Sequence, residues 1–126
     1  MTGEQILVVE DNEKNMKLFR DVLGASGFRT LEATTGTEAV DMASEHTPDL
    51  VLMDIQLPDL DGVQALHRLR GDERTATIPV LALTAQAMRG DRERFLAEGF
   101  DGYVSKPVNV RELVEIVRQH SAGRIG

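Results

Sequence analysis

Three short runs of the sequence contain only apolar residues, and none of them alternates apolar with polar positions. They span residues 6–9, 50–53 and 78–83. Strands that are apolar on both faces are typical of a parallel sheet that helices cover on both sides. Between the runs lie longer stretches in which apolar residues return every three or four positions, which is the spacing of amphipathic helices. This alternation predicts an α/β fold.

Two weaker strands and five helices complete the expected pattern. Residues 28–33 mix polar with apolar side chains, as an edge strand does, and residues 102–105 form the fifth strand. The signals for helix ends are Gly24 and Gly27, the capping box Thr35-Gly36-Thr37-Glu38, Gly99, and Asn109 as an N-cap. The helical stripes are Met16, Phe19, Val22 and Leu23, then Val63, Leu66 and Leu69, then Met88, Arg92, Phe95 and Leu96, then Val110, Leu113, Val114 and Val117. We expect a single doubly wound (βα)5 domain of the flavodoxin-like class, with five parallel strands in the order 2-1-3-4-5.

Length and composition exclude several classes of protein. A chain of 126 residues fits one domain, so we expect a core over about 5–120, a frayed tail over 121–126 and no output domain. The formal net charge of −7 offers no basic surface to nucleic acid or to an anionic membrane. Without cysteine the chain has no disulfide, thiolate nucleophile or iron–sulfur cluster. No apolar run approaches the roughly eighteen residues of a membrane span, so we expect a cytoplasmic protein.

Acidic and polar residues follow the predicted strands, at the edge where a parallel sheet binds its ligands. They are Glu10 and Asp11 after the first strand, Asp54 after the third, Thr84 after the fourth and Lys106 after the fifth. Three carboxylates at close range repel one another unless a cation neutralises them, and oxygen donors without Cys or His favour Mg²⁺. Asp54 can then attack a phosphoryl donor in line, while Lys106 and the metal offset charge and Thr84 donates a hydrogen bond. The predicted product is an aspartyl phosphate.

With these motifs, the sequence resembles the response-regulator receiver domains of two-component signalling over residues 5 to 120. The segments that match are Val9-Glu10-Asp11-Asn12, then Leu52-Met53-Asp54 followed by Pro58 and Gly62, then Leu83-Thr84-Ala85, and finally Tyr103 with Lys106-Pro107. Length and the stretch 9–22 further resemble stand-alone regulators of the DivK type.

The resemblance implies a role for each matching residue in the acidic site. It makes Asp54 the phosphoacceptor, Asp11 a direct metal ligand and Glu10 a ligand to a metal-bound water. Gln56 supplies a backbone carbonyl to the metal. The expected metal is Mg²⁺, with Mn²⁺ as a substitute, and Lys106 contacts the phosphoryl group.

The resemblance also implies a switch. Thr84 and Tyr103 form the switch pair, and the peptide bond before Pro107 is cis. Tyr103 in its resting state is expected to pack as a half-exposed aromatic on the sheet edge. Gln56 and Gln86 flank the approach of hydrolytic water and are expected to slow self-dephosphorylation.

The implied function is phosphorelay signalling rather than turnover of an external substrate. A histidine kinase or a histidine phosphotransfer protein donates the phosphoryl group. Output is phosphorylation-dependent binding of partner proteins through the face made by the fourth helix, the fifth strand and the fifth helix. Neither nucleic acid nor a membrane is expected as a partner.

Other readings fit the sequence less well. A flavin carrier with this fold needs a first loop that cradles a phosphate, which Glu10 and Asp11 would repel. A phosphatase of the haloacid-dehalogenase type needs a second acid two positions after Asp54, where Gln56 stands. A phosphorylation-independent adaptor with a receiver fold stays open as the alternative. His46, His67 and His120 are expected on the surface, and Asp59 and Asp61 are expected to be turn residues because they do not fit a calcium loop.

Overall fold

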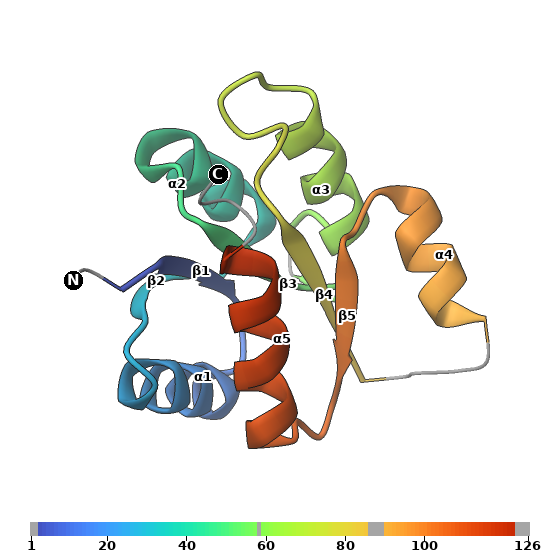
Figure 1. The fold of residues 1–126 in the computed structure, drawn as a ribbon. Coiled ribbons are helices and arrows are strands. Elements are labelled where there is room, and N and C mark those ends of the chain that lie inside the picture. Colours follow the sequence, from blue (N-terminus) through green and yellow to red (C-terminus); the bar gives the residue numbers. More distant parts are fainter. Residues whose placement is uncertain (1–2, 58, 86–89, 123–126) are drawn as a thin grey trace.

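The computed structural model of the chain describes residues 3–57, 59–85 and 90–122. Within these ranges strands and helices alternate along the chain (Figure 1). The strands are β1 (Gln5–Val9), β2 (Arg29–Ala33), β3 (Leu50–Asp54), β4 (Val80–Thr84) and β5 (Gly102–Ser105). The helices are α1 (Glu13–Ala25), α2 (Gly36–His46), α3 (Gly62–Arg70), α4 (Asp91–Glu98) and α5 (Val110–Ala122).

All strand pairs are parallel, and the sheet order is β2-β1-β3-β4-β5. The predicted (βα)5 architecture and strand order are therefore confirmed. β2 and β5 form the two edges, and the mixed composition of residues 28–33 indicated this position for β2. Asp54 pairs with Leu83 and Thr84 with Ser105. Both Asp54 and Thr84 are thus the last residues of their strands, whereas the sequence placed them just beyond.

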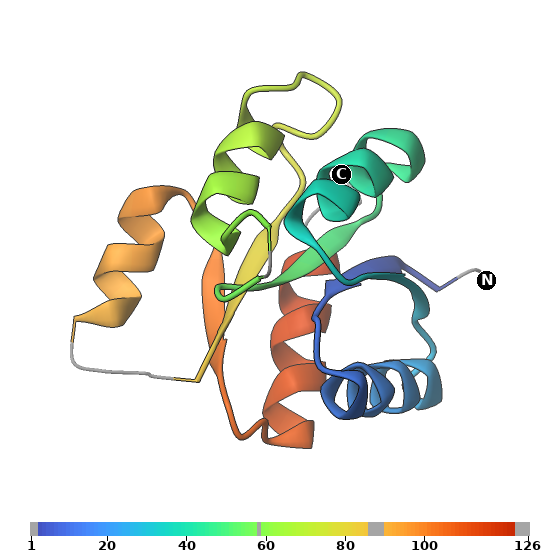
Figure 2. The ribbon, with the colours of Figure 1, turned by 180° about the vertical axis from the view of Figure 1, so that it is seen from behind.

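The helices form one layer on each face of the sheet (Figures 1 and 2). Helices α1 and α5 cover one face, where Phe19, Leu23 and Leu113 pack on Ile6 and Leu52. Helices α2, α3 and α4 cover the other face and pack on the alternate residues of the same strands. Every residue of β3 and β4 is buried, and each of their aliphatic side chains contributes to one of the two cores. Burying one such aliphatic side chain stabilises the fold by about 1.5–3 kcal/mol.

The helix boundaries agree with the sequence signals at α1 and α2, with small differences. Asn12 caps α1, which runs past Gly24, and Gly27 follows it with a φ of 94°. Thr35 caps α2 by accepting from the Glu38 amide. The predicted capping box is incomplete because the Glu38 carboxylate accepts from the amide of Thr34, not of Thr35.

The later helices differ more from expectation. A full capping box lies at α3, where Asp61 and Gln64 bond reciprocally, so Asp61 is an N-cap and not only a turn residue. Helix α4 begins at Asp91, and the expected position Met88 lies outside the described residues. Asn109 accepts from the amide of Glu112 and caps α5, as predicted.

Helix α5 also continues into the segment that was expected to fray. Its last residues are Ser121 and Ala122, and Ser121 is 1% exposed. The expectation of a tail from residue 121 is therefore wrong for Ser121 and Ala122. The rest of the expected tail, residues 123–126, lies outside the described part of the chain.

Arg70, the last residue of α3, joins three parts of the molecule on one side of the sheet. Its Nη1 donates to the carbonyls of Ala76 and Ile78, at 3.1 and 2.6 Å. Its Nη2 donates to the Gly99 carbonyl at 3.0 Å and to the Asp101 carboxylate at 2.9 Å. The end of α3, the connection to β4 and the end of α4 are thereby fixed to one another.

Candidate phosphoacceptor and cation site

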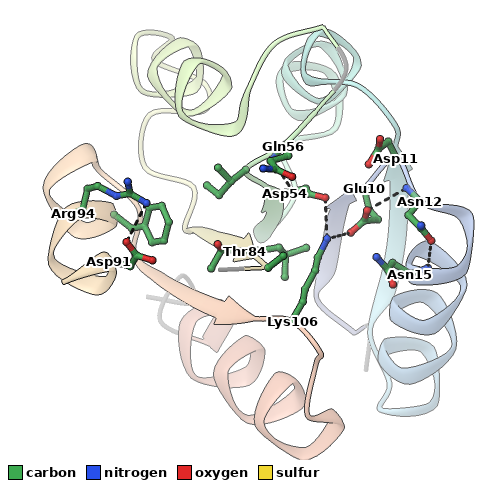
Figure 3. Close-up of a pocket in the computed structure, with 14 residues that line it drawn as sticks. Glu10, Asp11, Asn12, Asn15, Asp54, Gln56, Thr84, Asp91, Arg94 and Lys106 are labelled. Carbon is green, nitrogen blue, oxygen red and sulfur yellow. Dashed lines mark hydrogen bonds and ion pairs between the residues drawn. The ribbon is translucent and has the colours of Figure 1, made fainter. Parts of the chain in front are cut away.

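A pocket of about 510 Å³ lies at the carboxyl edge of the sheet (Figure 3). Every described residue that the sequence placed at a strand end around the acceptor lines this pocket. These residues are Glu10, Asp11, Asp54, Gln56, Thr84 and Lys106. Parallel β1, β3, β4 and β5 end at this edge, so topology alone brings together residues that are far apart in the sequence.

Three carboxylates converge in the pocket. Glu10, Asp11 and Asp54 each offer one oxygen, and these oxygens lie within 4.8 Å of one another. Glu10 and Asp54 are 1% and 5% exposed, whereas Asp11 is exposed at the mouth. A cluster of hard oxygen donors with one solvent-facing member suits a divalent cation that keeps part of its water shell.

Lys106 bridges the two buried carboxylates. Its Nζ lies 2.8 Å from Glu10 Oε1 and 3.0 Å from Asp54 Oδ2. Burial raises the pKa of Glu10, and the hydrogen bond from Lys106 only partly opposes that effect. Burial lowers the pKa of Lys106, but the hydrogen bonds and the negative charges of Glu10 and Asp54 together outweigh it, so that this pKa is also raised. Lys106 is therefore a charged ammonium at neutral pH and supplies local positive charge beside Asp54.

Local backbone geometry orients the Asp54 side chain. The amide of Gln56 donates to Asp54 Oδ1 at 3.0 Å. The other carboxylate oxygen, Oδ2, faces Lys106. Gly62, the first residue of α3, lies so close that a Cβ there would be 2.5 Å from the Asp54 carbonyl oxygen. The glycine that follows the acceptor in the sequence motif is therefore required by the close approach of α3 to the end of β3.

Thr84 and Tyr103 lie on neighbouring strands near the pocket. Thr84 lines the pocket and is 7% exposed. Tyr103 is partly buried and its ring packs against Phe95 of α4, with 6.1 Å between ring centroids. This packing confirms the expected half-exposed aromatic at the sheet edge. The peptide bond between Lys106 and Pro107 is cis, as predicted.

Two charged residues that line the pocket were missed by the sequence reasoning. Asp91 and Arg94 of α4 form an ion pair, with Arg94 Nη2 3.2 Å from Asp91 Oδ1 (Figure 3). The Arg94 guanidinium also lies over the ring of Phe95, 4.9 Å from its centroid. The only sequence signal was the i,i+3 spacing of opposite charges, which is equally common on solvent-facing helices.

The remaining predicted positions lie elsewhere. Gln86 lies outside the described residues. His46 and His67 are exposed, as expected, whereas His120 is half-buried with Nδ1 2.9 Å from the Ile116 carbonyl. None of the three histidines belongs to the acidic cluster. In the described part of the chain, no helix is both long and apolar enough to span a membrane.

Comparisons with known proteins agree with this geometry. Residues 6–118 match the model of the response regulator receiver domain. The polar-differentiation response regulator DivK of Brucella ovis is 48% identical over 117 residues, which cover 93% of this chain and 95% of that protein.

Solved structures give the same picture. The receiver domain of the sensor histidine kinase PA1611 from Pseudomonas aeruginosa PAO1 is 37% identical, with a TM-score of 0.88 and coverage of 96% of this chain and 99% of that one. That structure holds a magnesium ion coordinated in its active site cleft. The signal receiver domain of a signal transduction histidine kinase from Syntrophus aciditrophicus is 31% identical, with a TM-score of 0.88 and coverage of 98% and 93%. Because the family match spans nearly the whole chain and agrees with both fold and relatives, the chain belongs to the response regulator receiver domain family.

Proposed function

We propose that the chain is a stand-alone response regulator of the DivK kind. In this role Asp54 accepts a phosphoryl group from the phosphohistidine of a histidine kinase or of a histidine phosphotransfer protein, in a Mg²⁺-dependent reaction. The observation that carries the proposal is the convergence of three carboxylates within 4.8 Å, two of them held by one lysine ammonium.

The donor set fits Mg²⁺. Asp11 and Asp54 would bind it through carboxylate oxygens, Glu10 through a water, and Gln56 through its backbone carbonyl; Mn²⁺ suits the same oxygen ligands. The magnesium ion in the PA1611 receiver domain supports this assignment. When bound, the metal offsets negative charge on the transferring phosphoryl oxygens.

The side chains of the chain perform the transfer itself. An Asp54 carboxylate oxygen attacks phosphorus, and the bond between phosphorus and the donor's imidazole nitrogen breaks, so that the product is an aspartyl phosphate. Lys106, already 3.0 Å from Asp54 Oδ2, offsets charge on the phosphoryl oxygens. Thr84 donates its hydroxyl to one of these oxygens. The chain is thus an acceptor that promotes its own phosphorylation, without turnover of an external substrate.

Labelling by acetyl phosphate tests the acceptor. The wild type should be labelled in Mg²⁺ and Asp54→Asn should not, with intact fold by circular dichroism. The control is Glu73→Gln, which removes an exposed carboxylate that does not line the pocket and should be labelled like the wild type. An unlabelled wild type, or label that persists at another residue of Asp54→Asn, would sink the assignment.

Removal of a ligand tests the metal. Asp11→Ala should lose Mg²⁺ affinity and labelling together, because Asp11 is the exposed member of the cluster and is proposed to bind the metal directly. Mg²⁺ should also raise the melting temperature of the wild type, since it binds only the folded cluster. An unchanged Mg²⁺ titration of Asp11→Ala would contradict the ligand set.

Output is proposed to occur through partner binding at the face of α4, β5 and α5. Phosphorylation draws Thr84 toward the phosphoryl group and lets Tyr103 turn inward, which changes this face. Thr84→Ala should accept phosphate yet lose phosphorylation-dependent partner binding. Equal affinity of a partner for both forms of the wild type would favour the adaptor alternative. The net charge of −7 favours protein partners over nucleic acid or anionic membranes.

The lifetime of the aspartyl phosphate is proposed to depend on two amides. Gln56 lines the pocket next to Asp54, and Gln86 follows Thr84 by two positions in the sequence. A neutral amide cannot act as a general base for water but occupies its path. Gln56→Asn and Gln86→Glu should therefore alter the decay of labelled protein; unaltered decay in both variants and in their combination would discard this role.

A further inference from the structure

The loop between β3 and α3 is attached to a helix that precedes it in the sequence. The Asp59 carboxylate accepts from the amides of Gly36 and Thr37, at 2.8 and 3.2 Å, and from the Thr37 hydroxyl. Asp59 therefore caps α2 from a separate loop, although the sequence predicted only a turn residue there. The amides of a helix's first turn have no partners within the helix, and a carboxylate at that end is favourable.

The contact between Asp59 and α2 does more than cap the helix. Thr35 already accepts from the Glu38 amide at 3.0 Å, and Glu38 accepts from the Thr34 amide at 2.7 Å. These local contacts leave the amides of Gly36 and Thr37 to Asp59. What Asp59 adds is a long-range connection between α2 and the loop that follows the acceptor strand.

A second, independent contact seats the same loop on α2. A Cβ at Gly36 would lie 2.4 Å from the Leu60 carbonyl oxygen and 2.7 Å from the Leu60 Cβ. The backbone of the loop therefore rests directly on the first residue of α2, at the position next to Asp59. Only glycine at position 36 leaves room for this approach.

The other end of the loop is fixed at the acceptor. The Gln56 amide donates to Asp54 Oδ1 at 3.0 Å, so Gln56 lies between one attachment at Asp54 and another at Asp59. Its carbonyl is the proposed backbone ligand of the metal. The hydrogen bond from Thr37 and those from the backbone amides of Gly36 and Thr37 lower the pKa of Asp59 to about 2, so the carboxylate stays ionised throughout the neutral range.

We propose that Asp59 is a positioning residue for the cation site, which acts by holding the Gln56 backbone in place through its attachment to the start of α2. This inference rests on the proposed function, because it assumes that the Gln56 carbonyl binds Mg²⁺. Asp59 itself contacts neither metal nor phosphate. Its loss should weaken Mg²⁺ binding while the chemistry of Asp54 at saturating Mg²⁺ is largely preserved.

The Mg²⁺ dependence of labelling by acetyl phosphate tests this role. Loss of a group that orients a metal ligand lowers metal affinity by about tenfold or more, so Asp59→Ala should raise the half-saturating Mg²⁺ concentration by about tenfold, with a saturated rate within about twofold of wild type. Asp59→Asn keeps one acceptor oxygen, so its half-saturating Mg²⁺ concentration should lie between those of the wild type and Asp59→Ala. Gly36→Ala, which displaces Leu60 but removes no hydrogen-bonding group, should raise the half-saturating concentration as well.

Glu38→Ala is the matched control. It removes a cap contact at the same end of α2 but leaves the loop attached, so it should lose stability and keep the wild-type Mg²⁺ dependence. A wild-type half-saturating concentration in Asp59→Ala would overturn the proposal, as would an equal rise in Glu38→Ala. If the wild type is not labelled at all, the proposed function fails, and calorimetric titration of the same variants with Mg²⁺ alone still decides the role of Asp59.

Discussion

The close approach of α3 to the acceptor strand allows a quantitative test at Gly62. A Cβ at this position would lie 2.5 Å from the Asp54 carbonyl oxygen and 2.9 Å from the Ile55 Cα. Both neighbours are backbone atoms, and the hydrogen bond from the Gly62 amide to the Ile55 carbonyl at 2.9 Å holds them there. Since ordinary contact begins near 3.4 Å and the Asp54 carbonyl oxygen would be at 2.5 Å, Gly62→Ala must separate the end of β3 from the start of α3 by about 0.9 Å.

Two consequences of different size follow for Gly62→Ala. Overpacking of this kind costs about 1–3 kcal/mol, so the free energy of unfolding should fall by about 2 kcal/mol. The displaced atoms include the backbone of Asp54 itself. A shift of about 1 Å at a reacting group can reduce a rate by about 100-fold. The rate of Mg²⁺-dependent labelling by acetyl phosphate should therefore fall much more than the loss of folded protein alone would explain.

The assay is urea unfolding followed by far-ultraviolet circular dichroism, since the chain has no tryptophan. The matched control is Gly24→Ala in α1, where a Cβ would meet nothing within 4 Å. Alanine is favoured over glycine in a helix by about 0.5–1 kcal/mol, so this control should be more stable than the wild type and labelled equally. Wild-type stability and labelling in Gly62→Ala would refute the reasoning, because the contact would then be relieved at no cost.

Three further predictions concern charge and stability. Lys106→Met leaves Glu10 and Asp54 buried without their cation, so the free energy of unfolding at neutral pH should fall by about 3 kcal/mol. Mg²⁺ should restore part of this stability in thermal melts, and a melting temperature that does not depend on Mg²⁺ would contradict the prediction. The pKa of Asp59 in the folded state is about 2, below its ordinary 3.8. The ionised carboxylate therefore stabilises the fold above pH 3.8, and this contribution is lost as the pH falls toward 2. The difference in free energy of unfolding between wild type and Asp59→Asn should narrow over this interval. Arg70→Ala removes donors to three carbonyls and a carboxylate and should lower the free energy of unfolding by about 2–3 kcal/mol in urea.

The parts of the fold that were predictable are those set by local pattern and parallel topology. The apolar run 50–53 predicted a strand covered on both faces, and the flavodoxin-like class predicted its neighbours in the sheet. The same topology brought Glu10, Asp54 and Lys106 together before any contact was known. Residue type and position at a strand end were sufficient for these side chains.

Contacts between elements that are distant in the sequence were not predictable in the same way. Asp59 looks like any polar turn residue, and only the packing of its loop on α2 shows that it caps that helix. Asp91 and Arg94 enter the pocket because of where α4 sits on the sheet, which periodicity does not specify. Ser121 was assigned to a tail because polar and glycine residues follow, yet it lies buried at the end of α5.

The two ends of α4 have different surroundings, because one is joined to the rest of the domain and the other lines the acceptor pocket. Its C-terminal end is a pivot, because Arg70 holds the Gly99 carbonyl and Phe100 is buried with its ring edge-on to Phe95. Its N-terminal end follows Gly90, which has no side chain to cap the helix, and it lines the acceptor pocket through Asp91. With eight residues α4 is about 12 Å long, so a tilt of about 10° about the pivot moves the Asp91 end by about 2 Å. A rearrangement beside the acceptor would thus reach the molecular surface as a change of helix angle.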